Sequence, residues 1–119
     1  MNRKDLEKRL IAYAIDILKL TDEIPKSGSG KHLAGQLIRS GTSPALNYAE
    51  SQSAESRKDF IHKMSIALKE LRETLICLTL IKGTNNYKDH MKVDILIDEC
   101  NQLISIFVKS IQTATKRLR

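Results

Sequence analysis

Residues 60–81 read FIHKMSIALKELRETLICLTLI, and the apolar side chains in this stretch recur with the spacing of a bundled helix. They alternate at intervals of four and three residues over three heptads: Phe60, Met64, Ala67, Leu71, Thr74, Leu78 and Ile81. A 3.5-residue period of this kind keeps one helix face against neighbouring helices. Ser56 and Asp59 form a capping pattern ahead of the stretch, and Gly83 favours a stop behind it. The sequence therefore predicts a long helix between Ser56 and Gly83.

Two other segments carry a similar apolar stripe. The first predicts a helix over about residues 4–20, with its stripe at Leu6, Leu10, Tyr13, Ile17 and Leu20. The last opens after residues 83–86, with its stripe at Leu96, Cys100, Leu103, Phe107, Ile111, Ala114 and Leu118. The two cysteines, Cys77 and Cys100, lie in apolar stretches without metal-ligand spacing. We expect both to be reduced thiols in the core.

The remaining helix contains a proline. It begins near Lys31, and its apolar face is formed by Leu33, Leu37 and Ile38. Pro44 lacks the backbone N–H and its ring clashes with the carbonyl four residues back, which predicts a kink or a short interruption. One bent helix and two short helices are both compatible with the pattern. The preceding residues 21–30, TDEIPKSGSG, hold a proline, two serines and two glycines and predict the principal linker.

Four amphipathic helices joined by short connections are typical of an all-α, antiparallel, left-handed four-helix bundle. A chain of 119 residues fits a single domain spanning residues 1–119. Hydrophobic residues at 41% and charged residues at 29% are ordinary for a folded protein, and aromatic residues at 4% disfavour an all-β fold. No signal peptide and no run of 18 apolar residues stands out, so we expect a cytoplasmic protein without a membrane partner.

Residues 74–81, TLICLTLI, are uncharged on every side of the predicted helix. A helix that is apolar all round is usually buried all round, and the core of one small bundle buries only one side. We therefore expect Ile76 and Leu80 to lie at an interface between subunits of an oligomer. The alternative is that they are isolated apolar residues on the surface, which are common in soluble proteins.

The residues that carry most enzyme and metal chemistry are not grouped in this sequence. Residues 26–31, KSGSGK, lack the glycine spacing and the hydroxyl residue of a phosphate-binding loop. The histidines, His32, His62 and His90, fall on three separate segments without a metal-binding pair. No serine or cysteine lies in the setting of an activated nucleophile. We predict a protein that is not an enzyme and has no catalytic, cofactor-binding or metal-binding residues.

The charge of the chain is +6, and much of it lies near the two termini. From residue 101 onward there is no acidic residue, whereas four basic residues occur: Lys109, Lys116, Arg117 and Arg119. A basic cluster also starts the chain: Arg3, Lys4, Lys8 and Arg9. A positive surface of this kind favours nucleic acid as a partner. Cations at the end of a helix also stabilise its dipole, and a solvated basic face is the alternative interpretation.

A mixed run of charges occurs in the middle of the chain. Lys69, Glu70, Arg72 and Glu73 are neighbours in the long helix, and either glutamate is placed to reach Arg39 or Lys63. Such pairs more often set helix register than perform chemistry.

Two spaced motifs stand out: RSGTS at residues 39–43 with Asn47 and Glu50 following, and F..K..IALKE..ET from Phe60 to Thr74. They resemble a bacterial family of four-helix bundle proteins encoded in intervening sequences of 23S ribosomal RNA genes, also called S23 ribosomal proteins. The resemblance spans nearly the whole chain. It implies a non-enzymatic subunit of a ring-shaped homopentamer with a suspected role in binding nucleic acid. The chain is also similar to the accessory variability protein of diversity-generating retroelements, which implies a reverse transcriptase or another protein as a further partner.

The resemblance also suggests roles for individual residues. Arg39 and Lys63 join Lys109, Lys116, Arg117 and Arg119 as candidate nucleic-acid-binding residues. The remaining motif positions are expected to be structural: Ser40, Gly41, Ser43, Asn47, Glu50, Lys69, Glu70 and Glu73. Small side chains in the first motif allow neighbouring helices to approach closely. Pro44 departs from the family pattern, which leaves the straightness of that helix open.

These observations predict a homo-oligomeric bundle that binds structured RNA or duplex DNA through phosphate contacts. The scarcity of aromatic residues argues against base stacking along a single strand. The alternative is a protein–protein interaction scaffold whose positive charge is incidental.

Overall fold

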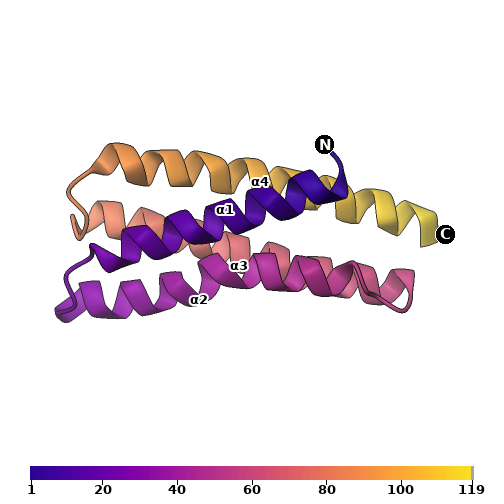
Figure 1. Cartoon of the computed structure of the whole chain (residues 1–119), viewed down its shortest axis with the longest axis horizontal. Helices are drawn as coiled ribbons and strands as arrows, with labels where there is room; N and C mark the ends of the chain where they lie inside the picture. Colours follow the sequence, from indigo (N-terminus) through magenta and orange to yellow (C-terminus); the bar gives the residue numbers. More distant parts are fainter. Residues whose placement is uncertain (119) are drawn as a thin grey trace.

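The computed structural model describes residues 1–118, which form four helices and no strand (Figure 1). The helices are α1 (Arg3–Asp22), α2 (Gly28–Ser51), α3 (Arg57–Gly83) and α4 (His90–Leu118). They lie lengthwise in a body of 48 × 21 × 21 Å. The predicted all-helical class and the number of helices are confirmed.

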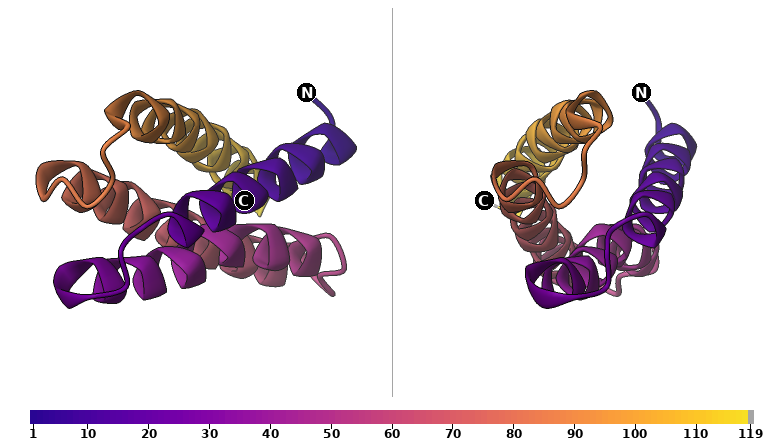
Figure 2. Two further views of the ribbon diagram at one scale, coloured as in Figure 1. Left: turned by 60° about the vertical axis from the view of Figure 1, so that its left-hand side comes forward. Right: turned by 90° about the vertical axis from the view of Figure 1, so that its left-hand side faces the viewer.

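The two termini and the α2–α3 connection lie at one end of the molecule, and the other two connections lie at the opposite end (Figure 1). Packing is most extensive between α2 and α3, and it is least extensive between α1 and α4 among the helix pairs that are in contact. The end-on view shows α1 and α4 as the two arms of an open arrangement, with α2 and α3 between them (Figure 2).

The apolar stripe of α3 forms the centre of the core, as predicted. Six of its seven members are buried and the first, Phe60, is half-buried. In α4, five of the seven predicted stripe residues are buried, whereas Ile111 is half-buried and Leu118 is exposed. The last turns of α4 extend beyond the start of α1, so α1 does not cover them (Figure 1). Val93 is fully buried and was missed by the predicted stripe.

Side-chain caps fix where two of the helices begin. The Ser56 hydroxyl accepts a hydrogen bond from the Asp59 backbone N–H at 3.0 Å, which confirms the predicted start of α3. At α1, Asn2 and Asp5 form a reciprocal capping box. At the other end of α3, Gly83 is the last helical residue, but it does not adopt a left-handed conformation. Asn85, with φ of 55°, makes that turn instead.

α2 is one continuous helix through Pro44, which settles the two alternatives left open by the sequence. Pro44 is buried and cannot donate to the Ser40 carbonyl, and hydroxyls on the solvent side supply hydrogen bonds to neighbouring carbonyls. Thr42 donates to the Ile38 carbonyl at 2.7 Å, and Ser43 donates to the Arg39 carbonyl at 2.6 Å.

α2 also begins at Gly28, earlier than expected, so part of the predicted linker is helical. The helix can start there because Gly28 adopts φ of 54° and Gly30 packs closely against the Pro25 carbonyl, where a side chain would collide. The connection between α1 and α2 is correspondingly short.

Both cysteines are buried and unpaired in the core, as predicted. The Cys77 thiol lies 3.4 Å from the Leu33 carbonyl oxygen, and the Cys100 thiol lies 3.1 Å from that of Leu71. Burial raises the pKa of Cys100 to about 11, so its thiol stays protonated at neutral pH. Within residues 1–118, none of the helices combines the length and apolar character needed to span a bilayer.

Candidate nucleic-acid interface

The fold concentrates the net positive charge in one half of the molecule. When each helix is divided at its midpoint, the half with both termini comprises residues 1–12, 40–70 and 104–118. This half has eleven Lys or Arg residues and six Asp or Glu residues, a net charge of +5. The opposite half, residues 13–39 and 71–103, has eight of each and is neutral. We call the charged half the basic end.

A cleft of about 660 Å³ opens at the basic end, between α1, α4 and the start of α3. Four cationic side chains line it: Arg3, Arg57, Lys109 and Arg117. No acidic side chain of the described residues lines it. Apolar side chains from all four helices form its floor: Leu6, Tyr48, Phe60, Ile106 and Ala114. We call this feature the basic cleft.

The four cations of the basic cleft have no carboxylate partner among the described residues. Every ion pair in that part of the chain involves other side chains, such as Arg9 with Glu99 at 2.5 Å. Four like charges near one cleft raise the local positive potential, and a bound anion would relieve their mutual repulsion. The arrangement is therefore suited to binding an anion such as a phosphate.

The predicted nucleic-acid-binding residues are dispersed by the fold. Lys109 and Arg117 line the basic cleft, and Lys116 is exposed at the same end without lining it. Lys63 lies 3.5 Å from Asp59, one turn earlier in α3. Arg119 lies outside the described residues. Arg57, at the start of α3, was not among the predicted residues, because nothing in the local sequence shows that three chain segments meet at this end.

Arg39 is held in ion pairs. Its guanidinium lies 2.9 Å from Glu70 and 3.0 Å from Glu73 of α3, which is one of the pairings that the sequence allowed. The two carboxylates offset its charge, and the ion pairs tie α2 to α3.

The remaining motif residues lie mainly along α2. Gly41 lets α2 approach α1, and the Ser43 hydroxyl bonds within its own helix. Asn47 and Glu50 make no side-chain hydrogen bond within residues 1–118.

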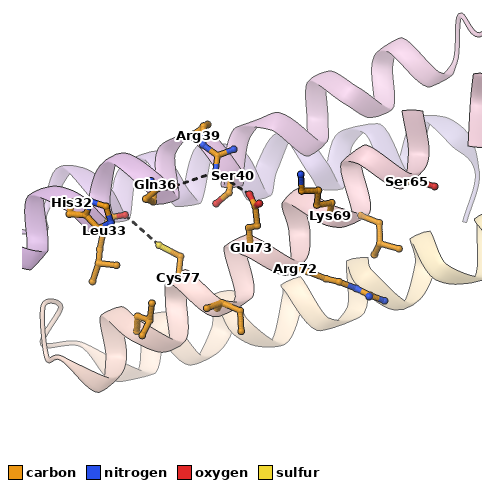
Figure 3. Close-up of a pocket in the computed structure, with 13 residues that line it drawn as sticks. His32, Leu33, Gln36, Arg39, Ser40, Ser65, Lys69, Arg72, Glu73 and Cys77 are labelled. Carbon is orange, nitrogen blue, oxygen red and sulfur yellow. Dashed lines mark hydrogen bonds and ion pairs between the residues drawn. The ribbon is translucent and has the colours of Figure 1, made fainter. Parts of the chain in front are cut away.

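A second surface feature is the groove between α2 and α3, with a volume of about 630 Å³ (Figure 3). Ile76 and Leu80 line it and are 60% and 48% exposed. Its rim is polar and includes His32, Lys69 and Arg72 (Figure 3). We call it the α2–α3 groove. It holds the two residues that the sequence predicted at a subunit interface.

These features define an all-helical protein with four lengthwise helices, a cationic cleft at one end and an apolar groove along one side. The family is established by comparison of the chain with family models. The chain belongs to the family of 23S rRNA-intervening sequence proteins, whose model matches residues 4–109. This confirms the family resemblance predicted from the two motifs.

A solved structure from the S23 ribosomal protein family shares the fold. It is a protein of unknown function from Bacteroides thetaiotaomicron, with a TM-score of 0.83 and 27% sequence identity. The match covers 94% of this chain and 99% of that chain. A search of the curated proteins found no match to this chain. The relation to the accessory variability protein of diversity-generating retroelements stays a prediction.

Proposed function

We propose that this protein is a non-enzymatic, homo-oligomeric bundle that binds structured RNA or duplex DNA through phosphate contacts at its basic end. The observation that carries the proposal is the placement of charge. The basic end has a net charge of +5, whereas the opposite half is neutral. A field of one sign, confined to one end, attracts and orients a polyanion.

Self-association would repeat the basic end around an assembly. The α2–α3 groove exposes Ile76 and Leu80 in a single subunit, and contact with another copy would remove this apolar surface from water. The family resemblance implies a ring of five subunits. Within each subunit we propose that the helices pack in an antiparallel, left-handed bundle. Each additional copy would multiply a field that is modest in one subunit.

A protein–protein interaction scaffold is the second candidate. The exposed apolar residues of the α2–α3 groove favour it, because a groove of this kind also accepts a helix of another protein. A reverse transcriptase as that partner is implied by the resemblance alone. In either case we expect the protein to act in the cytoplasm.

The test measures the affinity of a fluorescent RNA hairpin and a DNA duplex between about 50 and 200 mM salt. We expect the affinity to fall steeply, with a log–log slope of about −0.9 for each phosphate neutralised on B-DNA. The triple variant Lys109→Gln, Lys116→Gln and Arg117→Gln should weaken binding and reduce the slope.

The matched control removes three charges from the neutral half. Lys19→Gln, Lys31→Gln and Lys88→Gln alter exposed side chains there and should leave the affinity nearly unchanged. If neither nucleic acid binds at the lowest salt concentration, the proposal is wrong and the scaffold becomes the working function. Equal losses in both triple variants would also contradict a site at the basic end.

A further inference from the structure

The floor of the basic cleft is apolar, whereas contacts to a phosphate backbone require only charged and polar groups. Tyr48 and Phe60 bring aromatic rings to it, and Leu6 adds an aliphatic side chain. The Tyr48 ring is held in place by an edge-on contact with Phe107, with ring centroids 5.9 Å apart. An apolar floor beneath cations suits a ligand that has a flat apolar part as well as an anionic group, as a nucleotide does.

The Tyr48 hydroxyl lacks a hydrogen-bond partner among the described residues, although only 5% of the residue is exposed. Within residues 1–118, Ser40 Oγ is the one fully buried side-chain polar atom without a partner, so the Tyr48 hydroxyl must reach a surface. The surface that Tyr48 lines is the basic cleft. At that surface the hydroxyl is accessible to water, so it is placed to donate a hydrogen bond to a ligand that displaces the water.

The protonation state of Tyr48 suits that role. Burial raises the pKa of Tyr48, while Arg3 lowers it and Glu7 raises it. The hydroxyl therefore stays protonated at neutral pH and acts as a donor to an anionic oxygen.

The size of the cleft limits what can enter it. Its volume of about 660 Å³ lies within the range of about 300–1,000 Å³ found for small-molecule sites. A duplex is too wide for such a recess, whereas the last nucleotide of a strand fits. A terminal phosphate is a monoester with a charge of about −1.5 to −2 at pH 7, which exceeds the single charge of each internal phosphodiester. Four cations without a carboxylate partner in residues 1–118 therefore favour the end of a strand over its middle.

We propose that the basic cleft binds the phosphorylated end of a nucleic-acid strand, with the terminal phosphate held by the cations and the Tyr48 hydroxyl, and the terminal base against the apolar floor. This inference rests on the proposed nucleic-acid binding and names the part of the ligand that enters the cleft. Arg3, Arg57, Lys109 and Arg117 supply the charge, and Tyr48 supplies a directional donor.

The experiment compares three versions of one RNA hairpin whose two ends are unpaired for a few nucleotides, labelled on a base of the loop. One has a 5′-phosphate, one has a 3′-phosphate, and one has hydroxyls at both ends. At about 150 mM salt we expect at least one phosphorylated version to bind about tenfold more tightly than the hydroxyl version. Equal affinities for all three would overturn the inference, while salt-sensitive binding of all three would leave the proposed function standing.

Two variants test the site itself. Tyr48→Phe removes only the hydroxyl and retains the ring, so it should reduce the preference for the phosphorylated end several-fold while the circular dichroism spectrum is unchanged. Arg57→Gln should reduce the preference by a similar factor, and Lys31→Gln, in the neutral half, should preserve it. A full preference in both Tyr48→Phe and Arg57→Gln would overturn the assignment to the basic cleft.

A free nucleotide shares the same chemistry and is distinguished by competition. AMP should displace the phosphorylated RNA only at concentrations far above that of the RNA, because the rest of the strand adds contacts to the basic end. If AMP and the phosphorylated RNA compete at equal concentrations, the assignment to a strand end is wrong and the cleft is a nucleotide site.

Discussion

Gly41 of α2 lies directly against Ile17 of α1. A Cβ built on Gly41 would fall 2.7 Å from Ile17 Cγ2 and 3.0 Å from Ile17 Cγ1. Ile17 is fully buried, so its side chain has no free space into which to move. This contact sets how closely α1 and α2 approach, and it explains why a small residue is needed at this position of the first motif.

Gly41→Ala should therefore destabilise the fold. Overpacking a core costs about 1–3 kcal/mol, which exceeds the roughly 0.5–1 kcal/mol that alanine gains over glycine inside a helix. We expect a net loss of about 1 kcal/mol in urea unfolding followed by circular dichroism. Gly35→Ala, at an exposed position of α2 where a Cβ meets nothing within 4 Å, is the control and should stabilise the protein. A stabilised Gly41→Ala would contradict the close contact.

Two buried serines of α2 should respond in opposite ways to removal of their hydroxyls. Ser40 Oγ has no hydrogen-bond partner among the described residues, whereas Ser51 Oγ donates to the Tyr48 carbonyl at 2.7 Å. An unpartnered buried hydroxyl costs about 1–3 kcal/mol, so Ser40→Ala should be neutral or stabilising. Ser51→Ala should cost about 1 kcal/mol. A clear loss of stability in Ser40→Ala, measured by the same urea unfolding, would mean that the hydroxyl is bonded in the assembled protein.

The carboxyl of Glu70 should titrate above the usual range for glutamate. Burial raises the pKa of Glu70 and the charge of Glu73 raises it further, while Arg39 lowers it. Arg39→Gln should therefore raise the pKa again, and Glu73→Gln should lower it, as followed by the carboxyl carbon shift in NMR. An unchanged midpoint in both variants would show that the three side chains do not interact in solution.

The same shift has a consequence for stability. Because the folded state holds the Glu70 proton more tightly than the unfolded state does, the folded state binds more protons between the two pKa values. The contribution of Glu70 to stability is therefore present below the unfolded pKa and is lost as pH rises through the folded pKa. Glu70→Gln should remove that part of the pH dependence in urea unfolding as the pH rises above the unfolded glutamate pKa of about 4.3.

Replacing Ile76 and Leu80 with glutamate should weaken self-association. Both side chains are exposed in the α2–α3 groove, and a charge buried between subunits without a partner is strongly unfavourable. Light scattering should report a lower mass for the double variant than for the wild-type protein. Met91→Glu, at an exposed position of α4 away from the groove, is the control and should leave the mass unchanged. Equal masses for the wild type and the double variant would rule out the groove as a subunit interface.

Patterns within one segment were enough to predict the helices. The stripe of α3 could be read directly because residues three and four apart share a helix face whatever surrounds them. The cap at Ser56 is equally local, since its partner is three residues away. The continuity of α2 through Pro44 was not predictable, because the burial of the proline ring and the hydroxyl bonds beside it depend on packing against α1 and α3.

Sequence alone thus determined the helical class, the four segments, most of the core stripes and the family motifs, because each depends on spacing along one stretch of chain. Tertiary structure decided which charges act together. Arg3, Arg57 and Lys109 are more than fifty residues apart from one another in the sequence, yet they line one cleft because the helix connections bring the two termini and the start of α3 to the same end. Arg39, equally basic in the sequence, is offset by carboxylates of α3. The type of a residue sets its charge, but the side chains that the fold places beside it decide whether that charge can attract an anion.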